Sequence, residues 1–181
     1  HTCLSLIENN YNVFIIDSLI NSSEDNLISI NKISKFSKKS QLGKIFFYQG
    51  DIRNREFLIN TFKKAKFENM PIEAVIHFAG LKSVNESIEN PLSYWDVNVC
   101  GTINLLCAMK EFKCNKIVFS SSATVYKPEF DKLLTEQSEL GPINPYGNTK
   151  LAVETILGNL VKEPFHEWRI ANLRYFNPVG C

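Results

Sequence analysis

The heptapeptide NPYGNTK at 144–150 places a phenol and an ammonium four residues apart, at Tyr146 and Lys150. Pro145 predicts the first turn of a helix here, so the two side chains are neighbours on one helix face. A tyrosine has an ordinary pKa of about 10, and a positive charge within roughly 4 to 6 Å lowers such a pKa by about 1 to 3 units. We therefore expect Lys150 to lower the pKa of Tyr146 and make it a base for a substrate hydroxyl. An exposed helix face could contain the same pair by chance.

A run of hydroxyl side chains strengthens this interpretation. Residues 120–124, SSSAT, follow the apolar run at 116–119 and are expected at the carboxyl end of a strand. Ser122 could bind the same substrate oxygen as Tyr146 and pass on its proton, and Thr124 could share that work. Ser120 and Ser121 could equally cap their own backbone in a serine-rich turn.

The elements that must position these side chains alternate between strands and helices. Strands are predicted at Val13 to Asp17, Ile45 to Gln49, Ala74 to Phe78, Lys116 to Ser120 and Ile170 to Tyr175; helices are predicted at residues 1–8, 26–33, 54–66, 91–112 and 145–161. Apolar strands alternating with helices indicate an α/β fold, a Rossmann-like doubly wound parallel sheet covered on both faces.

Small and polar residues end each predicted strand, where ligands bind in such sheets. They are Asp17, then Gly50, Asp51 and Ile52, then Phe78, Ala79 and Gly80, then Ser120 to Ser122, then Tyr175, Phe176 and Asn177. Any one of these groups could simply mark the change from strand to loop, but five such groups at successive strand ends favour a ligand site. A carboxylate at Asp17 is placed to accept hydrogen bonds from ribose hydroxyls, which favours NAD over NADP.

Both ends of the chain lack the signals of a complete domain. Residues 1–8 have helical spacing without a start signal, and the chain stops just after the last predicted strand. We expect one partial NAD-binding domain over 1–181, from a longer protein, with the first strand and its glycine-rich phosphate loop absent from the chain. Residues 127–144 carry prolines and glycines and could be a cover over the site or a plain linker.

We predict that the 181 residues alone neither fold stably nor hold NAD. The first strand of a doubly wound sheet lies in its middle, so its absence leaves buried backbone groups unpaired at about 1 to 3 kcal/mol each. A typical domain has only about 5 to 15 kcal/mol of stability. A cooperative melt of this chain with stoichiometric NAD, measured by calorimetry, would refute the prediction.

Composition excludes several classes of partner. Twenty basic and nineteen acidic residues give a formal charge of +1, so no nucleic acid or anionic membrane is predicted. No apolar run approaches the roughly 18 residues of a membrane span, and we expect a cytoplasmic protein. The five cysteines have no metal-ligand spacing, so no metal is predicted and we interpret the thiols as buried or incidental.

Seven stretches together resemble the extended short-chain dehydrogenase/reductase family, and within it the UDP-hexose 4-epimerases. They lie at 1–17, 50–54, 75–87, 98–102, 118–126, 144–151 and 173–180. FSSSATVY, HFAGLK and RYFNPVG are the most specific of them, and the resemblance covers nearly the whole chain. It implies NAD as a bound cofactor, a UDP-hexose as substrate and a homodimer formed through the helices at 91–112 and 145–161.

The resemblance also implies roles for individual residues. The catalytic set is Tyr146, Lys150, Ser122 and Thr124. The cofactor set is Asp17, Asn21, Ser22, Asp51, Ile52, Phe78, Ala79, Gly80, Lys82, Asn98, Ser120, Tyr146, Lys150 and Tyr175. The substrate set is Lys82, Ser122, Thr124, Tyr146, Phe176 and Asn177.

The implied reaction interconverts UDP-glucose and UDP-galactose. Hydride leaves C4 of the hexose for NAD while the tyrosine takes the 4-hydroxyl proton, the 4-keto sugar turns over, and hydride returns to the other face. Dehydratases of this fold carry an Asp-Glu pair where this chain has Ala123 and Thr124, which argues against elimination of water. Two alternatives stay open: another NAD-dependent nucleotide-sugar epimerase or dehydratase, and a non-catalytic dinucleotide-binding protein.

Overall fold

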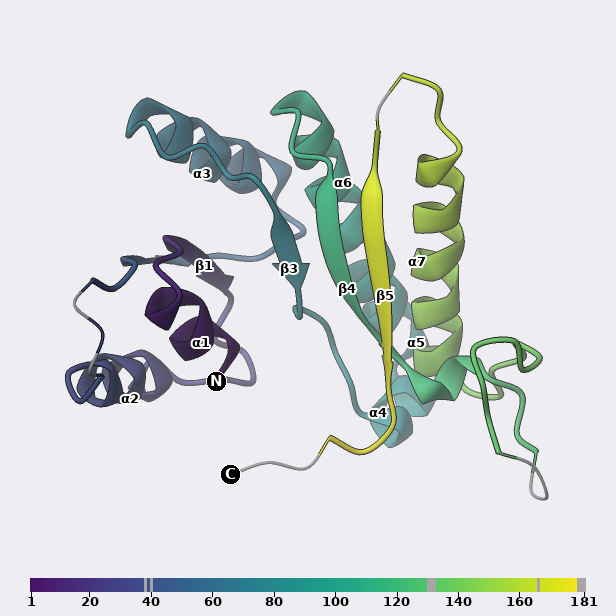
Figure 1. Ribbon diagram of the computed structural model, residues 1–181. Helices are drawn as coiled ribbons and strands as arrows, with labels where there is room; N and C mark the ends of the chain where they lie inside the picture. Colours follow the sequence, from purple (N-terminus) through teal and green to yellow (C-terminus); the bar gives the residue numbers. More distant parts are fainter. Residues whose placement is uncertain (38, 40, 130–132, 166, 179–181) are drawn as a thin grey trace. The chain divides into compact units, whose positions relative to one another are not determined.

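The computed structural model describes residues 1–37, 39, 41–129, 133–165 and 167–178 (Figure 1). The chain divides into two compact units, His1–Ile72 and Glu73–Cys181. Each unit is described by itself below, and a single domain over 1–181 stays a prediction. Cys181 lies outside the described residues; the four other cysteines are free thiols.

The first unit is a two-stranded parallel sheet with three helices. Its elements are α1 (Thr2–Glu8), β1 (Val13–Asp17), α2 (Asp25–Ser34), β2 (Ile45–Gln49) and α3 (Arg55–Phe67). The strands pair from Val13 with Ile45 to Asp17 with Gln49, and Phe14 stacks on Phe46 at 4.6 Å between ring centres. Asp17 therefore lies at the carboxyl edge of this sheet, as predicted.

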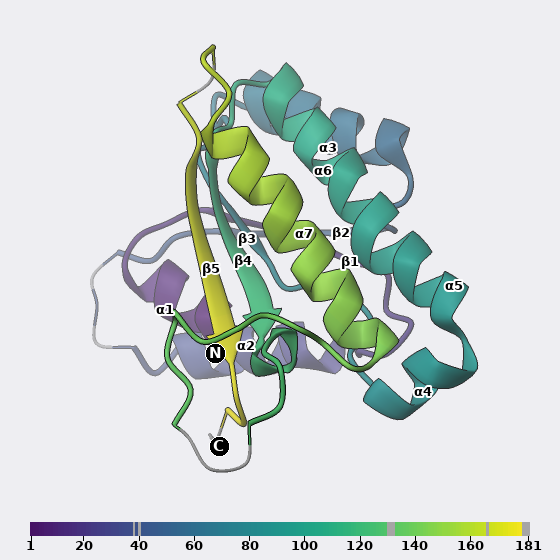
Figure 2. The same cartoon turned by 90° about the vertical axis from the view of Figure 1, so that its right-hand side faces the viewer.

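The second unit is a three-stranded parallel sheet of order β3-β4-β5 with helices packed on it. Its elements are β3 (Val75–His77), α4 (Val84–Glu89), α5 (Pro91–Tyr94), a π-helix (Trp95–Cys100), α6 (Gly101–Glu111), β4 (Lys116–Ser122), a 3₁₀ turn (Ala123–Val125), α7 (Pro145–Val161) and β5 (Arg169–Tyr175). Figures 1 and 2 show α7 lying along β4 and β5, which it contacts. Residues such as Phe119, Ile117, Leu157 and Val153 fill the core between them.

The α/β class with parallel sheets is confirmed. In the doubly wound order 3-2-1-4-5-6, the strands on the two sides of the first strand form a pair and a triple. The described strands form such a pair and such a triple, all of them parallel. The absence of a central first strand stays a prediction.

Two helical features differ from the sequence prediction. The helix predicted over 91–112 consists of α5, the π-helix and α6 in direct succession, and the wider π turn contains Asn98. π-helical turns inside α-helices are rare and are frequent at functional sites. The prediction also lacked α4, although Ser83 accepts a hydrogen bond from the Glu86 amide as in a capping box.

No helix of the described residues is long and apolar enough to cross a membrane. Among those same residues, no group of three or more His, Cys, Asp or Glu side chains could hold a metal ion.

Candidate active site

The start of α7 places Tyr146 and Lys150 next to the end of β4. Asn144 caps the helix, since its side chain accepts a hydrogen bond from the Gly147 amide at 2.8 Å. Lys150 is only 5% exposed, and its ammonium donates to the carbonyl oxygen of Ser120 at 2.8 Å. The same ammonium lies 5.7 Å from the centre of the Tyr146 ring. The predicted pairing of phenol and ammonium is therefore present.

The hydroxyl groups after β4 complete this cluster. Ser122 Oγ accepts hydrogen bonds from the Thr124 amide at 3.2 Å and from Thr124 Oγ1 at 3.0 Å. The Ser122 side chain also acts on the phenol of Tyr146 and works to lower its pKa. The four residues predicted as catalytic thus come from two elements, β4 with its following turn and α7, and meet at one place.

The direction of the tyrosine pKa differs from our expectation. Burial raises the pKa of Tyr146 above its ordinary value, and this outweighs the opposite effect of Ser122. Burial also lowers the pKa of Lys150 to about 8. The expectation that Lys150 lowers the pKa of Tyr146 is wrong for the protein without bound cofactor, because both groups are removed from water and burial favours the neutral form of each.

A buried hydrogen-bond chain joins β3, the π-helix and α7. His77 Nε2 lies 2.8 Å from Thr102 Oγ1, and the Thr102 hydroxyl donates to the carbonyl oxygen of Asn98 at 2.5 Å. Since Thr102 has one proton and gives it to that carbonyl, His77 Nε2 must be the donor to Thr102. Burial, and to a smaller degree the charge of Lys150, lower the pKa of His77 to about 3.

The Asn98 side chain extends this chain to the loop after β3. It accepts from the Leu81 amide at 2.8 Å, and donates to the Leu81 carbonyl at 3.0 Å and to Thr149 Oγ1 at 3.1 Å. Asn98 is 3% exposed, so it holds the loop and α7 in place from within the protein. Of the predicted cofactor residues in this loop, Phe78, Ala79 and Lys82 are exposed and Gly80 is half-buried.

Replacing Gly80 by alanine is expected to destabilise the protein by about 1 to 3 kcal/mol. Gly80 has a φ of +153°, which side chains rarely adopt, and an added Cβ would lie 2.9 Å from Asn98 Oδ1. The matched control is Gly158→Ala, since Gly158 lies in α7 with nothing within 4 Å of an added Cβ. The control is expected to be neutral or more stable. Thermal melts of both full-length variants test this, and equal melting temperatures would contradict it.

A cavity of about 370 Å³ opens beside the catalytic hydroxyls. Five predicted residues line it, namely Ser122, Thr124, Tyr175, Phe176 and Asn177. The sequence prediction missed Ala123, Tyr126, Lys127, Pro128, Leu134, Ile143 and Asn144 as individual lining residues. Most of these belong to the predicted cover or linker at 127–144, and their contact with the cavity favours a cover. Lys82 does not line this cavity.

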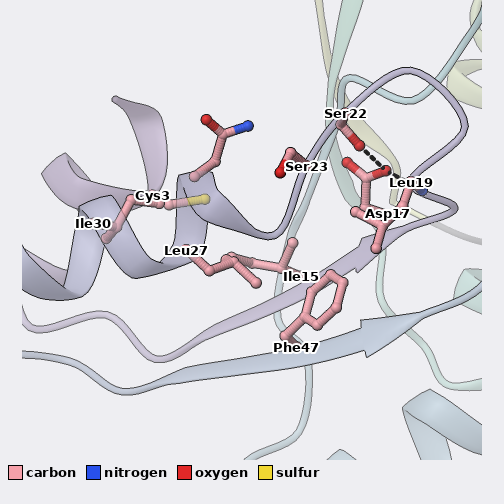
Figure 3. A pocket seen from close by; sticks show the side chains of 10 residues that line it. Cys3, Ile15, Asp17, Leu19, Ser22, Ser23, Leu27, Ile30 and Phe47 are labelled. Carbon is pink, nitrogen blue, oxygen red and sulfur yellow. Dashed lines mark hydrogen bonds between the residues drawn. The ribbon is translucent and has the colours of Figure 1, made fainter.

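The first unit contains a separate, smaller cavity of about 140 Å³ beside Asp17 (Figure 3). Asp17 Oδ1 accepts from the Leu19 amide at 2.8 Å and from the Ser22 hydroxyl at 2.7 Å. Both hydrogen bonds are accepted by Oδ1, and neither is accepted by the second carboxylate oxygen. The other lining residues are Cys3, Ile15, Ser23, Asn26, Leu27, Ile30 and Phe47, so this wall is mostly apolar.

The remaining predicted cofactor residues of this unit do not line that cavity. Asn21 is exposed and Ile52 is buried. The Asp51 carboxylate is bound by the Arg53 guanidinium at 2.7 Å and by the Arg53 amide at 2.8 Å, and these hydrogen bonds lower the pKa of Asp51. The roles of Asn21, Asp51 and Ile52 stay predictions.

Comparison with known proteins gives a consistent picture. A family model described as GDP-mannose 4,6 dehydratase matches residues 1–181. A bifunctional UDP-glucose 4-epimerase and UDP-xylose 4-epimerase of Pisum sativum is 45% identical over 182 residues, covering 100% of this chain and 49% of that protein. A UDP-glucose 4-epimerase of Bacillus subtilis is 43% identical over 181 residues, covering 100% of this chain and 50% of that protein.

Two solved structures are similar over 99% of this chain and 50% of theirs. One is a UDP-glucose-4-epimerase from Stenotrophomonas maltophila with bound NAD and formylated UDP-arabinopyranose, with a TM-score of 0.86 and 40% identity. The other is a UDP-glucose 4-epimerase from Bifidobacterium longum in complex with NAD⁺ and UDP, with a TM-score of 0.85 and 39% identity. The chain thus spans about half the length of the relatives it matches.

Proposed function

We propose that this chain, which belongs to the GDP-mannose 4,6 dehydratase family, comes from a UDP-glucose 4-epimerase. It interconverts UDP-glucose and UDP-galactose, with NAD as a bound cofactor. The observation that carries the proposal is the meeting of Tyr146 and Lys150 with Ser122, which lines a cavity of about 370 Å³. A protein that only bound a dinucleotide would need none of these three side chains. The epimerases of Pisum sativum and Bacillus subtilis, at 45% and 43% identity, support the same function.

The residues around Asp17 fit the adenosine end of NAD. The carboxylate keeps one oxygen that neither Leu19 nor Ser22 uses, and a ribose diol can donate to it. The mostly apolar wall formed by Ile15, Leu27, Ile30 and Phe47 suits contact with an adenine ring. The proposed role of Asp17 is therefore to bind the ribose and to select against a 2′-phosphate, which its charge would repel.

Bound NAD would supply the group that accepts hydrogen from C4 of the sugar and returns it. The chain's own residues handle the proton. Tyr146 takes the proton of the 4-hydroxyl, and Ser122 bonds the same oxygen and holds the phenol in place. Lys150, charged for the most part at pH 7, places a positive charge behind the developing phenolate.

An oxidised nicotinamide also adds positive charge to this pocket. Because burial alone raises the pKa of Tyr146, we propose that Tyr146 becomes a competent base when oxidised cofactor and Lys150 act together. Tyr146 is then protonated in the free protein, would lose its proton once the oxidised cofactor is bound, and takes up the 4-hydroxyl proton as C4 is oxidised.

The remaining site residues are assigned from the lining of the larger cavity and from the family resemblance. Thr124, Phe176 and Asn177 contact the sugar nucleotide, since they line the larger cavity. Lys82 does not line that cavity, and its proposed contact with the substrate and the dinucleotide rests on the family resemblance. The same resemblance assigns the cofactor to Phe78, Ala79, Gly80, Asn98, Ser120 and Tyr175.

Elimination of water is the less favoured activity. A dehydratase must protonate a leaving hydroxyl at C6 and remove a proton at C5, which requires an acid and a base beside the sugar. The positions directly after Ser122 are Ala123 and Thr124, and both line the cavity. Neither side chain can act as a carboxylic acid, so the site suits simple removal and return of hydrogen at C4.

We also propose a cytoplasmic homodimer formed through the helices at 91–112 and 145–161, with the neighbouring helix α4. Ile88, Leu92 and Ile103 are 62%, 83% and 42% exposed, and Trp95 is partly exposed beside them. Such a group of apolar side chains is typical of a protein–protein contact.

Product analysis of the full-length protein tests the proposed function. Incubation with UDP-galactose and no added reductant is expected to yield UDP-glucose. A 4-keto-6-deoxy product would instead identify a dehydratase. Bound NAD without any turnover of UDP-hexoses would identify a binding protein.

A further inference from the structure

A partly buried ion pair between Glu154 and Arg174 lies next to the catalytic cluster and takes no part in the proposed chemistry. The Arg174 guanidinium binds both oxygens of the Glu154 carboxylate, with Nη2 at 2.7 Å from Oε2 and Nε at 3.0 Å from Oε1. The side chains are 20% and 6% exposed. The Ser121 hydroxyl, itself buried, donates to Glu154 Oε1 as well. Glu154 is therefore fully engaged by hydrogen bonds from two directions.

The cluster joins α7 and β4, the two elements that carry the catalytic residues, to the neighbouring strand β5. Glu154 lies on α7 one turn beyond Lys150 and two turns beyond Tyr146, on the same helix face. Ser121 lies on β4 between Ser120 and Ser122, and it is paired in register with Arg174 of β5. Each member of the cluster is thus rigidly tied to a residue of the proposed site.

The helix α7 consequently has two polar attachments to β4 on this face. The first is the bond from Lys150 to the carbonyl oxygen of Ser120, and the second is the bond from Ser121 to Glu154. One attachment would leave the helix able to slide or turn about it. Two attachments one turn apart fix the distance between Tyr146 on the helix and Ser122 on the strand.

Arg174 extends the same cluster to the wall of the larger cavity. Its Nη1 donates to the Tyr126 hydroxyl at 3.0 Å, and its guanidinium lies 4.9 Å from the centre of the Tyr126 ring. Tyr126 lines that cavity together with Ser122 and Thr124. The bonds to Glu154 and Tyr126 raise the pKa of Arg174, which keeps it charged at every working pH.

Stability alone does not account for such an arrangement. A buried ion pair must overcome the desolvation of both charges, and apolar residues of similar size often replace one without loss of stability. The pair instead fixes the position of the catalytic side chains. A misplacement of about 1 Å in an active site can lower the rate by about 10²-fold.

We propose that Glu154 and Arg174 are positioning residues for epimerisation, which hold Tyr146 at its working distance from Ser122 and the sugar. The inference rests on the proposed function. It predicts that loss of the pair lowers kcat while the substrate and NAD still bind.

The test compares Glu154→Gln and Arg174→Lys with the parent in the full-length protein. Glutamine keeps the size of the side chain and can still accept from Ser121, but it loses the charge that binds Arg174. Lysine keeps the charge but cannot bind Glu154 at two points and Tyr126 at a third. We expect kcat for UDP-galactose to fall by about 10- to 10²-fold in each, with KM changed less than about 3-fold and bound NAD unchanged.

The matched control is Lys110→Met, which removes the ion pair between Lys110 and Glu163 in the same unit. Because this pair is more exposed than Glu154–Arg174, the variant should lose little in melting temperature and nothing in kcat. Ser121→Ala is a milder second variant for the case that the first two fail to fold, and it should lower kcat by about 3- to 10-fold.

Wild-type kcat in folded, NAD-loaded Glu154→Gln or Ser121→Ala would overturn the inference. So would an equal loss of kcat in Lys110→Met. If the parent protein itself does not epimerise UDP-galactose, the proposed function fails, and that outcome is recognisable before any variant is measured.

Discussion

Tyr146→Phe is expected to lower kcat for UDP-galactose by about 10² to 10⁴-fold, the range for loss of a positioned general base. The variant loses only the phenolic oxygen that takes the 4-hydroxyl proton. The ring should keep its place, since it packs edge-on against Tyr94 at 6.4 Å between ring centres. NAD content and the dissociation constant of UDP are therefore expected to stay unchanged. Initial rates, with NAD measured after denaturation, test this.

Tyr94→Phe is the matched control for this variant. The Tyr94 hydroxyl donates to Glu86 at 3.1 Å, and the residue is fully buried next to Tyr146. Its loss removes a phenolic oxygen from the same group of rings without touching the sugar. We expect kcat within about 3-fold of the parent. A Tyr146→Phe variant with near-parental kcat would show that another group takes the proton.

Lys150→Met is expected to lower kcat by about 10²-fold or more while the folded state loses no stability at pH 7. The ammonium is buried with a hydrogen bond to Ser120 as its principal compensation, and burial lowers its pKa to about 8 from an ordinary value of 10.5. A group held in this way serves function at the expense of stability. Methionine fills the same space without a charge.

The pH dependence of stability gives this prediction a second readout. Between pH 8 and 10.5 the lysine of the unfolded chain keeps its proton while the lysine of the folded protein loses it. The unfolded state then binds more protons, so the free energy of unfolding contributed by Lys150 rises with pH across this window. Denaturant melts of the full-length parent and of Lys150→Met should show this rise as a difference between the two proteins.

Lys116→Met, at the exposed start of β4, serves as the control for Lys150→Met. It should change neither kcat nor the pH dependence. A Lys150→Met protein that is much less stable than the parent at pH 7 would contradict the account, and so would one with parental kcat.

Much of the fold could be predicted because its signals are local. The strands β1 and β2 and the helix α7 have the predicted bounds, and the other strands agree within two residues. Apolar runs between turn residues identify strands, and Pro145 after a capping asparagine identifies the start of a helix. The π-helix was not predicted, because the apolar pattern of 91–112 does not distinguish it from the α-helices on either side.

The catalytic cluster could also be predicted, because two short segments carry it. Ser122 and Thr124 end one strand, and Tyr146 and Lys150 begin one helix, so each segment places its own pair. The direction of the Tyr146 pKa could not be predicted, since it depends on burial by distant parts of the chain. The Glu154–Arg174 pair was missed for a related reason, because its partners are 20 residues apart and meet only where α7 packs against β5.

The most direct test of the central claim follows the hydrogen at C4. UDP-galactose carrying deuterium at C4 is incubated with the full-length protein in ordinary water, and the UDP-glucose formed is examined by NMR. The account predicts that deuterium stays at C4 of the product, because hydrogen removed there is returned to the same carbon while Tyr146 exchanges only the hydroxyl proton. Deuterium lost to water, or found at C6, would contradict it.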